Sequence, residues 1–177
     1  KRDGTSLWIM ISHTPFKDAN GEVTYYDGAI VDISMQKAAE RELTLFSAAI
    51  DHSTTSVAIT NKQGYIVYAN PYFSRKMGYM LDEISGMDIR NFTLQHDSEA
   101  KKMWFELNRG KVWKGELNLH GRVGEILTQI TSVAPIKNDK NEIINYVMVS
   151  EDITDRKKAE IKLKEAKEKA EEATKAK

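Results

Sequence analysis

The residues that could carry out chemistry are few, and their types and spacing argue against catalysis. The chain has no cysteine, so it has no disulfide, no thiolate nucleophile and no cysteinyl photoadduct. Asp51, His52 and Ser53 have the side-chain types of a hydrolytic triad, but three adjacent residues do not reach the geometry in which a triad works. The four histidines include no pair at metal-ligand spacing, and no glycine-rich phosphate loop is present. We therefore predict a non-enzymatic chain without catalytic or metal-ligating residues.

The amino-acid composition further limits the class of protein. Of the 177 residues, 41% are hydrophobic and 29% are charged, which suffices for one core of about 110 residues with extensions. The 26 basic and 26 acidic side chains cancel, so no global field favours nucleic acid. No apolar run approaches the roughly 20 residues that cross a bilayer, and the first residues lack the apolar segment of a signal peptide. We expect a cytoplasmic protein that neither inserts into a membrane nor binds nucleic acid.

The elements that would position functional side chains occur twice. Residues 2–43 align with residues 122–163 at a constant spacing of 120 residues without a gap, and about a third of the aligned positions are identical. A repeat of this length corresponds to one small domain. We therefore predict the C-terminal strands of a preceding, incomplete domain, a linker helix, a complete domain and a coiled-coil output helix. These parts would occupy residues 1–34, 35–50, 51–155 and 156–177.

In the first copy, residues 7–12 and 22–32 are predicted strands, joined by a turn at residues 15–21 that contains Pro, Asp, Asn and Gly. From Lys37 the pattern becomes that of an amphipathic helix, because apolar residues fall four and three positions apart. This seam consists of Ala39, Leu43, Phe46 and Ile50.

The complete copy has strands on both sides of a helical insertion. The predicted strands cover residues 57–60, 65–69, 112–119, 125–134 and 142–150. Asn70 and Pro71 suit the cap and first position of a helix that Gly78 would end, and a longer helix is expected over residues 97–108. Because all helices fall in one insertion, they would cover one face of a five-stranded antiparallel sheet, which is an α+β fold.

Short motifs of this copy resemble those of the PAS domain family. They are Tyr68-Ala69-Asn70-Pro71, Met77-Gly78-Tyr79, Glu83-Ile84-Ser85-Gly86, Trp113-Lys114-Gly115-Glu116, Pro135-Ile136-Lys137-Asn138-Asp139 and Asp152-Ile153-Thr154-Asp155-Arg156-Lys157. Their order makes residues 45–155 similar to a PAS domain, and residues 1–34 resemble the tail of another. The resemblance implies a PAS fold flanked by signalling helices, and a sensory role in a multi-domain protein, most often a sensor histidine kinase.

The resemblance also implies a pocket for a small ligand between the helices and the sheet. Its predicted lining is Ile59, Val67, Phe73, Met77, Trp104, Trp113, Leu117, Ile130 and Val147. The alternative is that these residues only fill a core, as apolar residues at strand and helix spacing commonly do.

No cofactor is predicted, and the identity of a ligand stays unknown. Flavin photoreceptors of this family need a cysteine, and a second FAD-binding type usually carries an amide side chain where this sequence has Leu119. Haem sensors place an axial histidine within the long helix, whereas His96 lies at its beginning. FAD and haem are therefore both disfavoured.

The last residues of the sequence predict how a signal would leave the domain. The last strand passes through Asp152, Ile153 and Thr154 into a charged helix, and we expect these residues to relay the state of the pocket, with Thr154 or Asp155 as the helix cap. Apolar residues then recur at heptad spacing, which favours a parallel homodimer through the flanking helices. This dimer seam is Ala159, Leu163, Ala166, Ala170 and Ala173.

The predicted function is a regulatory module that binds a small ligand or relays a signal and passes it through a coiled coil to a downstream histidine kinase domain. Two alternatives stay open. One is a ligand-free dimerisation module, and the other is a PAS sensor that feeds a diguanylate cyclase.

Overall fold

The structure, a computed structural model, describes residues 7–94 and 97–175. The chain divides into two compact units, residues 1–49 and residues 50–177, and the two units share no sheet among the described residues.

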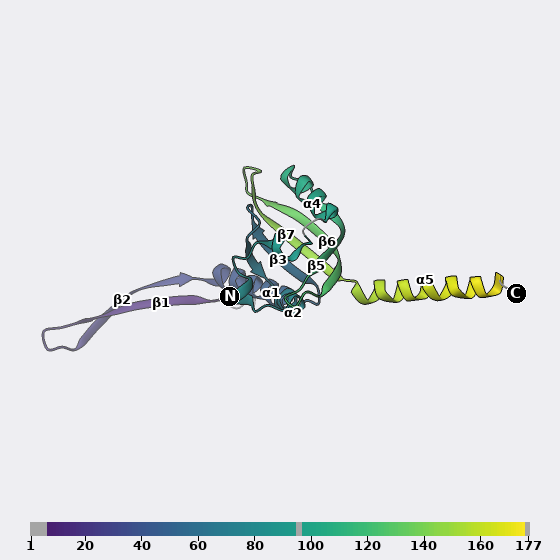
Figure 1. The fold of residues 1–177 in the computed structure, drawn as a ribbon. Helices are drawn as coiled ribbons and strands as arrows, with labels where there is room; N and C mark the ends of the chain where they lie inside the picture. Colours follow the sequence, from purple (N-terminus) through teal and green to yellow (C-terminus); the bar gives the residue numbers. More distant parts are fainter. Residues whose placement is uncertain (1–6, 95–96, 176–177) are drawn as a thin grey trace. The chain divides into compact units, whose positions relative to one another are not determined.

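The first unit is an antiparallel hairpin followed by a helix (Figure 1). Its elements are β1 (Ile9–Lys17), β2 (Val23–Asp32) and α1 (Ser34–Asp51), the last two residues of which belong to the second unit. Strand β1 is longer than predicted because it continues through Pro15, whose missing amide hydrogen is tolerated in a two-stranded sheet. The turn therefore starts only at Asp18, whose carboxylate accepts hydrogen bonds from the amides of Asn20 and Glu22.

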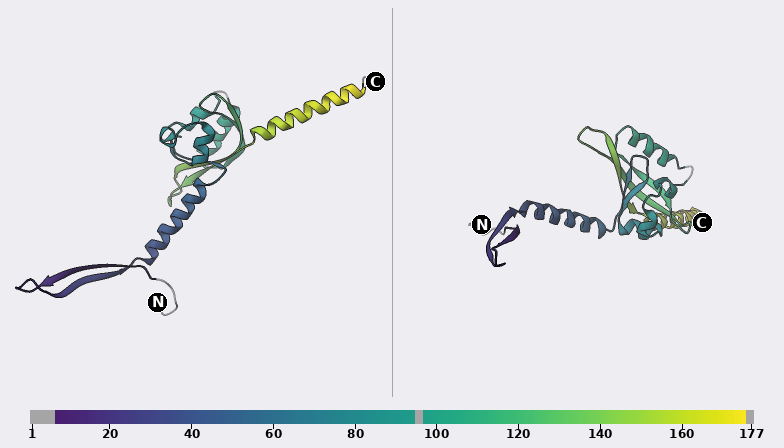
Figure 2. Two further views of the ribbon diagram at one scale, coloured as in Figure 1. Left: turned by 90° about the horizontal axis from the view of Figure 1, so that it is seen from below. Right: turned by 90° about the vertical axis from the view of Figure 1, so that its left-hand side faces the viewer.

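The second unit contains a five-stranded sheet and its helices (Figures 1 and 2). Its strands are β3 (Ser56–Asn61), β4 (Ile66–Ala69), β5 (Trp113–His120), β6 (Ile126–Lys137) and β7 (Ile143–Asp152). Its helices are α2 (Pro71–Met77), α3 (Leu81–Ile84), the 3-10 helix η1 (Ile89–Phe92), α4 (Ser98–Asn108) and α5 (Thr154–Lys175). All strand pairs are antiparallel, in the order β4-β3-β7-β6-β5. The helical segments between β4 and β5 cover one face, so the predicted α+β fold is confirmed.

The core lies between these helices and the sheet. Side chains alternate along β5, where Trp113, Leu117 and Leu119 are buried and the residues between them are not. Phe73 of α2 and Leu107 of α4 are fully buried in the same cluster. The predicted inward face of β5 is therefore confirmed.

Helix α2 has the ends that its sequence predicts. The side-chain oxygen of Asn70 accepts a hydrogen bond from the amide of Phe73, and Pro71 takes the first helical position. Gly78 ends the helix with a φ of 76°, a left-handed conformation in which glycine avoids the strain of a side chain. These two ends define the length and position of α2, which matters for the site below.

The repeat in the sequence is also a repeat in the structure. Ile9 pairs with Asp32 in the first hairpin as Gln129 pairs with Asp152 between β6 and β7, at the spacing of 120 residues. Both hairpins also shift register at the same place, between Phe16 and Lys17 and between Ile136 and Lys137. The first hairpin therefore has the geometry of the last two strands of the complete copy.

Candidate functional site: an interior cavity and the start of α5

A small cavity lies inside the second unit, between η1, α4 and the sheet. Its volume is about 10 Å³, which is close to the space that one water molecule needs. It is lined by Ile89, Arg90, Phe92, Thr93, Met103, Trp104, Leu117, Leu119 and Met148. In this conformation the interior is nearly filled by its own side chains.

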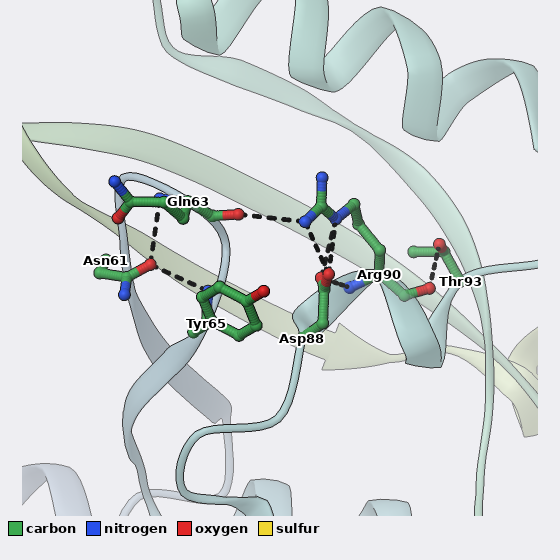
Figure 3. A network of polar contacts seen from close by, with 6 residues as sticks. All are labelled: Asn61, Gln63, Tyr65, Asp88, Arg90 and Thr93. Carbon is green, nitrogen blue, oxygen red and sulfur yellow. Dashed lines mark hydrogen bonds and ion pairs between the residues drawn. The ribbon is translucent and has the colours of Figure 1, made fainter.

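Arg90 stands at the rim of this cavity within a network of polar contacts (Figure 3). Its Nη2 atom lies 2.6 Å from Oδ2 of Asp88 and donates a hydrogen bond of 3.1 Å to the carbonyl of Gln63. The guanidinium lies 5.8 Å from the centre of the Trp104 ring. Hydrogen bonding to Arg90 holds the pKa of Asp88 below its usual value. Because the charges of Arg90 and Asp88 neutralise each other, the rim of the cavity suits an apolar or uncharged ligand.

The predicted pocket residues divide between two faces of the sheet. Phe73, Met77, Trp113 and Leu117 are buried in the core, and Trp104 packs against it. Only Trp104 and Leu117 line the cavity itself.

The prediction that the other four share this interior is wrong. They lie at positions that alternate with the buried residues of their strands and are half-buried or exposed: Ile59, Val67, Ile130 and Val147. Both faces of β3, β6 and β7 carry apolar side chains, so hydrophobicity alone did not indicate which face turns inward.

The inner face of the sheet also carries a buried polar patch, which the sequence analysis missed. Ser56, Thr131 and Ser150 are adjacent on β3, β6 and β7, and the hydroxyls of Thr131 and Ser150 lie 3.0 Å apart. Gln129 follows on the same face of β6 and is 0% exposed. Neither atom of its amide has a hydrogen-bond partner among the described residues. Such a group costs about 1–3 kcal/mol when it stays unpaired.

The polar patch distinguishes the two copies. At the spacing of 120 residues, the positions of Gln129, Thr131 and Ser150 are occupied in the first copy by isoleucines. These are Ile9, Ile11 and Ile30. The polar character therefore belongs to the complete copy and is not required by the shared hairpin geometry.

The start of α5 is held by a compact set of hydrogen bonds. The Asp152 carboxylate accepts from the amide of Thr154 over 2.9 Å and from its hydroxyl over 2.6 Å. The Thr154 hydroxyl oxygen accepts in turn from the amide of Thr128 on β6 over 3.0 Å. The first helical amide is thus bound by the side chain of Asp152, whereas the hydroxyl of Thr154, one of the two expected caps, bonds to Asp152 and to the amide of Thr128.

Ile153 and the first copy complete this picture. Ile153 is buried, as an anchoring role requires, and its amide donates to the carbonyl of Thr128 over 2.9 Å. Three of these bonds recur 120 residues earlier: the amide of Ser34 donates to Asp32, the Ser34 hydroxyl accepts from the amide of Trp8, and the amide of Ile33 donates to the carbonyl of Trp8. Each copy thus starts its following helix with a closely similar arrangement.

The complete copy adds a contact that sequence spacing did not indicate. Nζ of Lys76, in the last turn of α2, lies 2.9 Å from Oδ2 of Asp152. Hydrogen bonding to Asp152 raises the pKa of Lys76. Burial alone would raise the pKa of Asp152, but the hydrogen bonds from Lys76 and Thr154 and the charge of Lys76 lower it overall. Asp152 is therefore ionised and connects α2, β7 and α5.

The predicted dimer seam lies on a solvent-exposed helix. Ala159, Leu163, Ala166 and Ala170 are exposed, and Ala173 lies beyond the residues whose side chains are described. His96 also lies outside the described residues. Within the described residues, no cluster of three or more His, Asp or Glu side chains could hold a metal ion, and no helix is long and apolar enough to cross a membrane.

An antiparallel sheet with small helices on one face and a helix leaving the last strand defines an α+β domain. The chain belongs to the PAS domain family, whose model matches residues 1–35 and 54–155. The match includes both copies of the repeat.

The chain is also similar to two curated proteins and to a solved PAS domain. The nitrogen fixation regulatory protein of Klebsiella oxytoca is 23% identical over 130 residues, which cover 72% of this chain and 26% of that protein. Sporulation kinase E of Bacillus subtilis is 28% identical over 141 residues, which cover 75% and 18%. The crystal structure of a PAS domain from Colwellia psychrerythraea superposes with a TM-score of 0.58 at 21% identity, covering 64% of this chain and 98% of that one. The chain spans about a quarter or less of these two curated relatives and is a PAS sensory module related to signal-transduction proteins.

Proposed function

We propose that this chain is the regulatory module of a sensor histidine kinase, in which the interior of the PAS domain sets the geometry at the start of α5. The observation that carries the proposal is the position of Asp152, whose carboxylate binds α2 through Lys76 and α5 through Thr154. A change in the packing of α2 would therefore reach the first turn of α5 through one side chain.

A parallel homodimer is the second part of this proposal. The seam on α5 is exposed from Ala159 to Ala170 and consists mostly of alanines, which bury little apolar surface. Such a seam makes a weak coiled coil, and a change in its register costs little free energy. The similarity to Sporulation kinase E supports a kinase as the output in preference to a diguanylate cyclase.

The kinase proposal is tested by autophosphorylation of the full-length protein. We expect Asp152→Asn to change the basal rate several-fold, since the amide keeps the shape of the carboxylate but loses the charge that pairs with Lys76. Asp139→Asn, in the exposed turn between β6 and β7, is the matched control and should leave the rate unchanged. Equal rates for wild type and Asp152→Asn would refute the relay.

A small interior ligand is the third part. The unpaired amide of Gln129 supports a guest with hydrogen-bonding groups, because a partner there would remove the cost of a buried unsatisfied group. The small cavity favours the other candidate, a ligand-free dimerisation module, since a larger guest must displace side chains. Native mass spectrometry and an absorption spectrum of freshly purified protein distinguish the two: bound mass or a chromophore supports the sensor, and a bare homodimer supports the dimerisation module.

A further inference from the structure

Helix α2 is fixed at its first residues to the end of α1. The Asn70 side-chain nitrogen donates to the carbonyls of Ile50 (3.0 Å) and Thr55 (2.9 Å). Its side-chain oxygen accepts from the amides of Val57 (3.0 Å) and Phe73 (2.9 Å). Both donors and both acceptor positions of this fully buried amide are used, so its orientation is fixed.

A second hydrogen bond holds the same end of α1. The hydroxyl of Tyr68 donates a hydrogen bond of 2.6 Å to Oδ1 of Asp51, the last residue of α1. Burial, followed by this hydrogen bond and the charge of Asp51, raises the pKa of Tyr68 to about 12. The last turn of α1 is therefore hydrogen-bonded both to β4 and to the cap of α2.

The other end of α2 is tied to the output helix. Lys76 lies in its last turn and pairs with Asp152, which binds the first residue of α5. Phe73 and Met77, both fully buried, hold the body of the helix in the core. Seven residues at a rise of about 1.5 Å each make a rod of about 10 Å.

This connection does not run through the interior cavity. Among the described residues that line the cavity, none belongs to α2. The two ends of α2 therefore join α1 to α5 through contacts that an occupant of the cavity does not touch directly.

We propose that α2 is a rigid link that couples the end of α1 to the start of α5, with Asn70 and Lys76 as its positioning residues. Because α1 itself starts at the exit of the first copy, the link passes a signal from that exit to α5 whether or not the second copy has a ligand. This inference rests on the proposed function, since it treats α5 as the output.

The test is amide hydrogen exchange of the 177-residue chain, read at Thr154 and Lys157 in the first turn of α5. Asn70→Ser keeps a side chain that can cap α2 but loses the bonds to Ile50 and Thr55. We expect about five-fold faster exchange at both amides, the equivalent of one hydrogen bond. In a Lys76→Met background, the same substitution should have no further effect there.

The matched control is Asn145→Ser, which removes the hydrogen bond from the Asn145 side chain to the carbonyl of Thr60, away from α2. It should leave exchange at Thr154 and Lys157 unchanged. The proposal is overturned if Asn70→Ser has no effect at these amides, acts equally without Lys76, or is matched by the control.

Reciprocity supplies a second measurement that does not depend on the folding of the Asn70 variant. Coupling between two ends acts in both directions. Lys76→Met should therefore speed exchange of the Ser53 amide, which donates to the carbonyl of Ile50, by up to about five-fold. An unchanged rate contradicts the link. Neither measurement uses kinase output, so their failure leaves the autophosphorylation test of Asp152 intact, and the failure of that test leaves the exchange result intact.

Discussion

Nζ of Lys76 and Oδ2 of Asp152 lie 2.9 Å apart, although 76 residues separate them in the chain. The Asp152 side chain is 13% exposed and that of Lys76 is 37% exposed, so the pair is partly shielded from solvent. One ion pair thereby joins the short helix that follows β4 to the last residue of β7, whose carboxylate also binds the first residue of α5.

The Lys76–Asp152 pair predicts a pH window of stability. The lowered pKa of Asp152 gives a contribution that is present above its unfolded value, near 3.9, and is lost as pH falls through the folded value. The raised pKa of Lys76 gives a contribution that is present below about 10.4 and is lost as pH rises through the folded value. Urea unfolding should therefore show Lys76→Met less stable than wild type by at most about 1 kcal/mol between roughly pH 5 and pH 10. The difference should shrink below about pH 4, and a difference that persists there would argue against the pair.

Burial and the contact with Asp51 predict that Tyr68 ionises late. It should titrate with a pKa of about 12 when tyrosinate absorbance is followed. Tyr68→Phe should remove that step and lower the free energy of unfolding by about 1 kcal/mol, because Asp51 loses its hydrogen bond. Tyr25→Phe, at an exposed position of β2, should leave the late step in place.

Substitution of Gln129 is predicted to stabilise the free protein. Gln129→Leu removes an unpaired buried amide and should raise the free energy of unfolding by about 1 kcal/mol. Thr131→Val, two residues away on the same face, should lower it by about 1 kcal/mol because the hydroxyl of Ser150 loses its partner. If Gln129→Leu destabilises as much as Thr131→Val does, the amide is satisfied in solution. Loss of bound mass in the Gln129→Leu variant alone would assign the amide to a ligand.

Substitutions of two neighbouring apolar residues of α5 are predicted to differ in their effect on dimerisation. Leu163→Glu places a charge in the seam and should shift sedimentation equilibrium towards the monomer at least ten-fold, the equivalent of about 1.4 kcal/mol. Ile161→Glu, on another side of the same exposed helix, should leave the equilibrium unchanged. Equal effects of the two substitutions would place the interface elsewhere.

The fold could be predicted because its signals are local. Asn70, Pro71 and Gly78 specify the ends of α2 by capping and backbone geometry, which require no knowledge of distant residues. The repeat supported the prediction of the remaining elements, because a pattern found twice at one spacing is stronger evidence than either copy alone. The end of β1 was misplaced because Pro15 usually marks a turn, whereas a two-stranded sheet tolerates it.

The site was harder to predict because it depends on tertiary pairing. No spacing rule connects Lys76 with Asp152, and the inward face of β7 is ambiguous when Val147 and Met148 are both apolar. Gln129 could have been identified from the sequence, because the repeat aligns it with Ile9. A polar residue in one copy that aligns with an aliphatic residue in the other indicates that this position has a different role in the complete copy.

The closely similar exits of the two copies have a consequence for how such proteins can be lengthened or shortened. The segment 34–153 contains 120 residues, and its removal would join Ile33 directly to Thr154. Thr154 would then take the place of Ser34 beside Asp32 and Trp8, where the two bonds that correspond to its own are already made. We expect in-frame deletion or duplication of a whole unit to need no redesign of this connection, which would let such proteins grow by recombination.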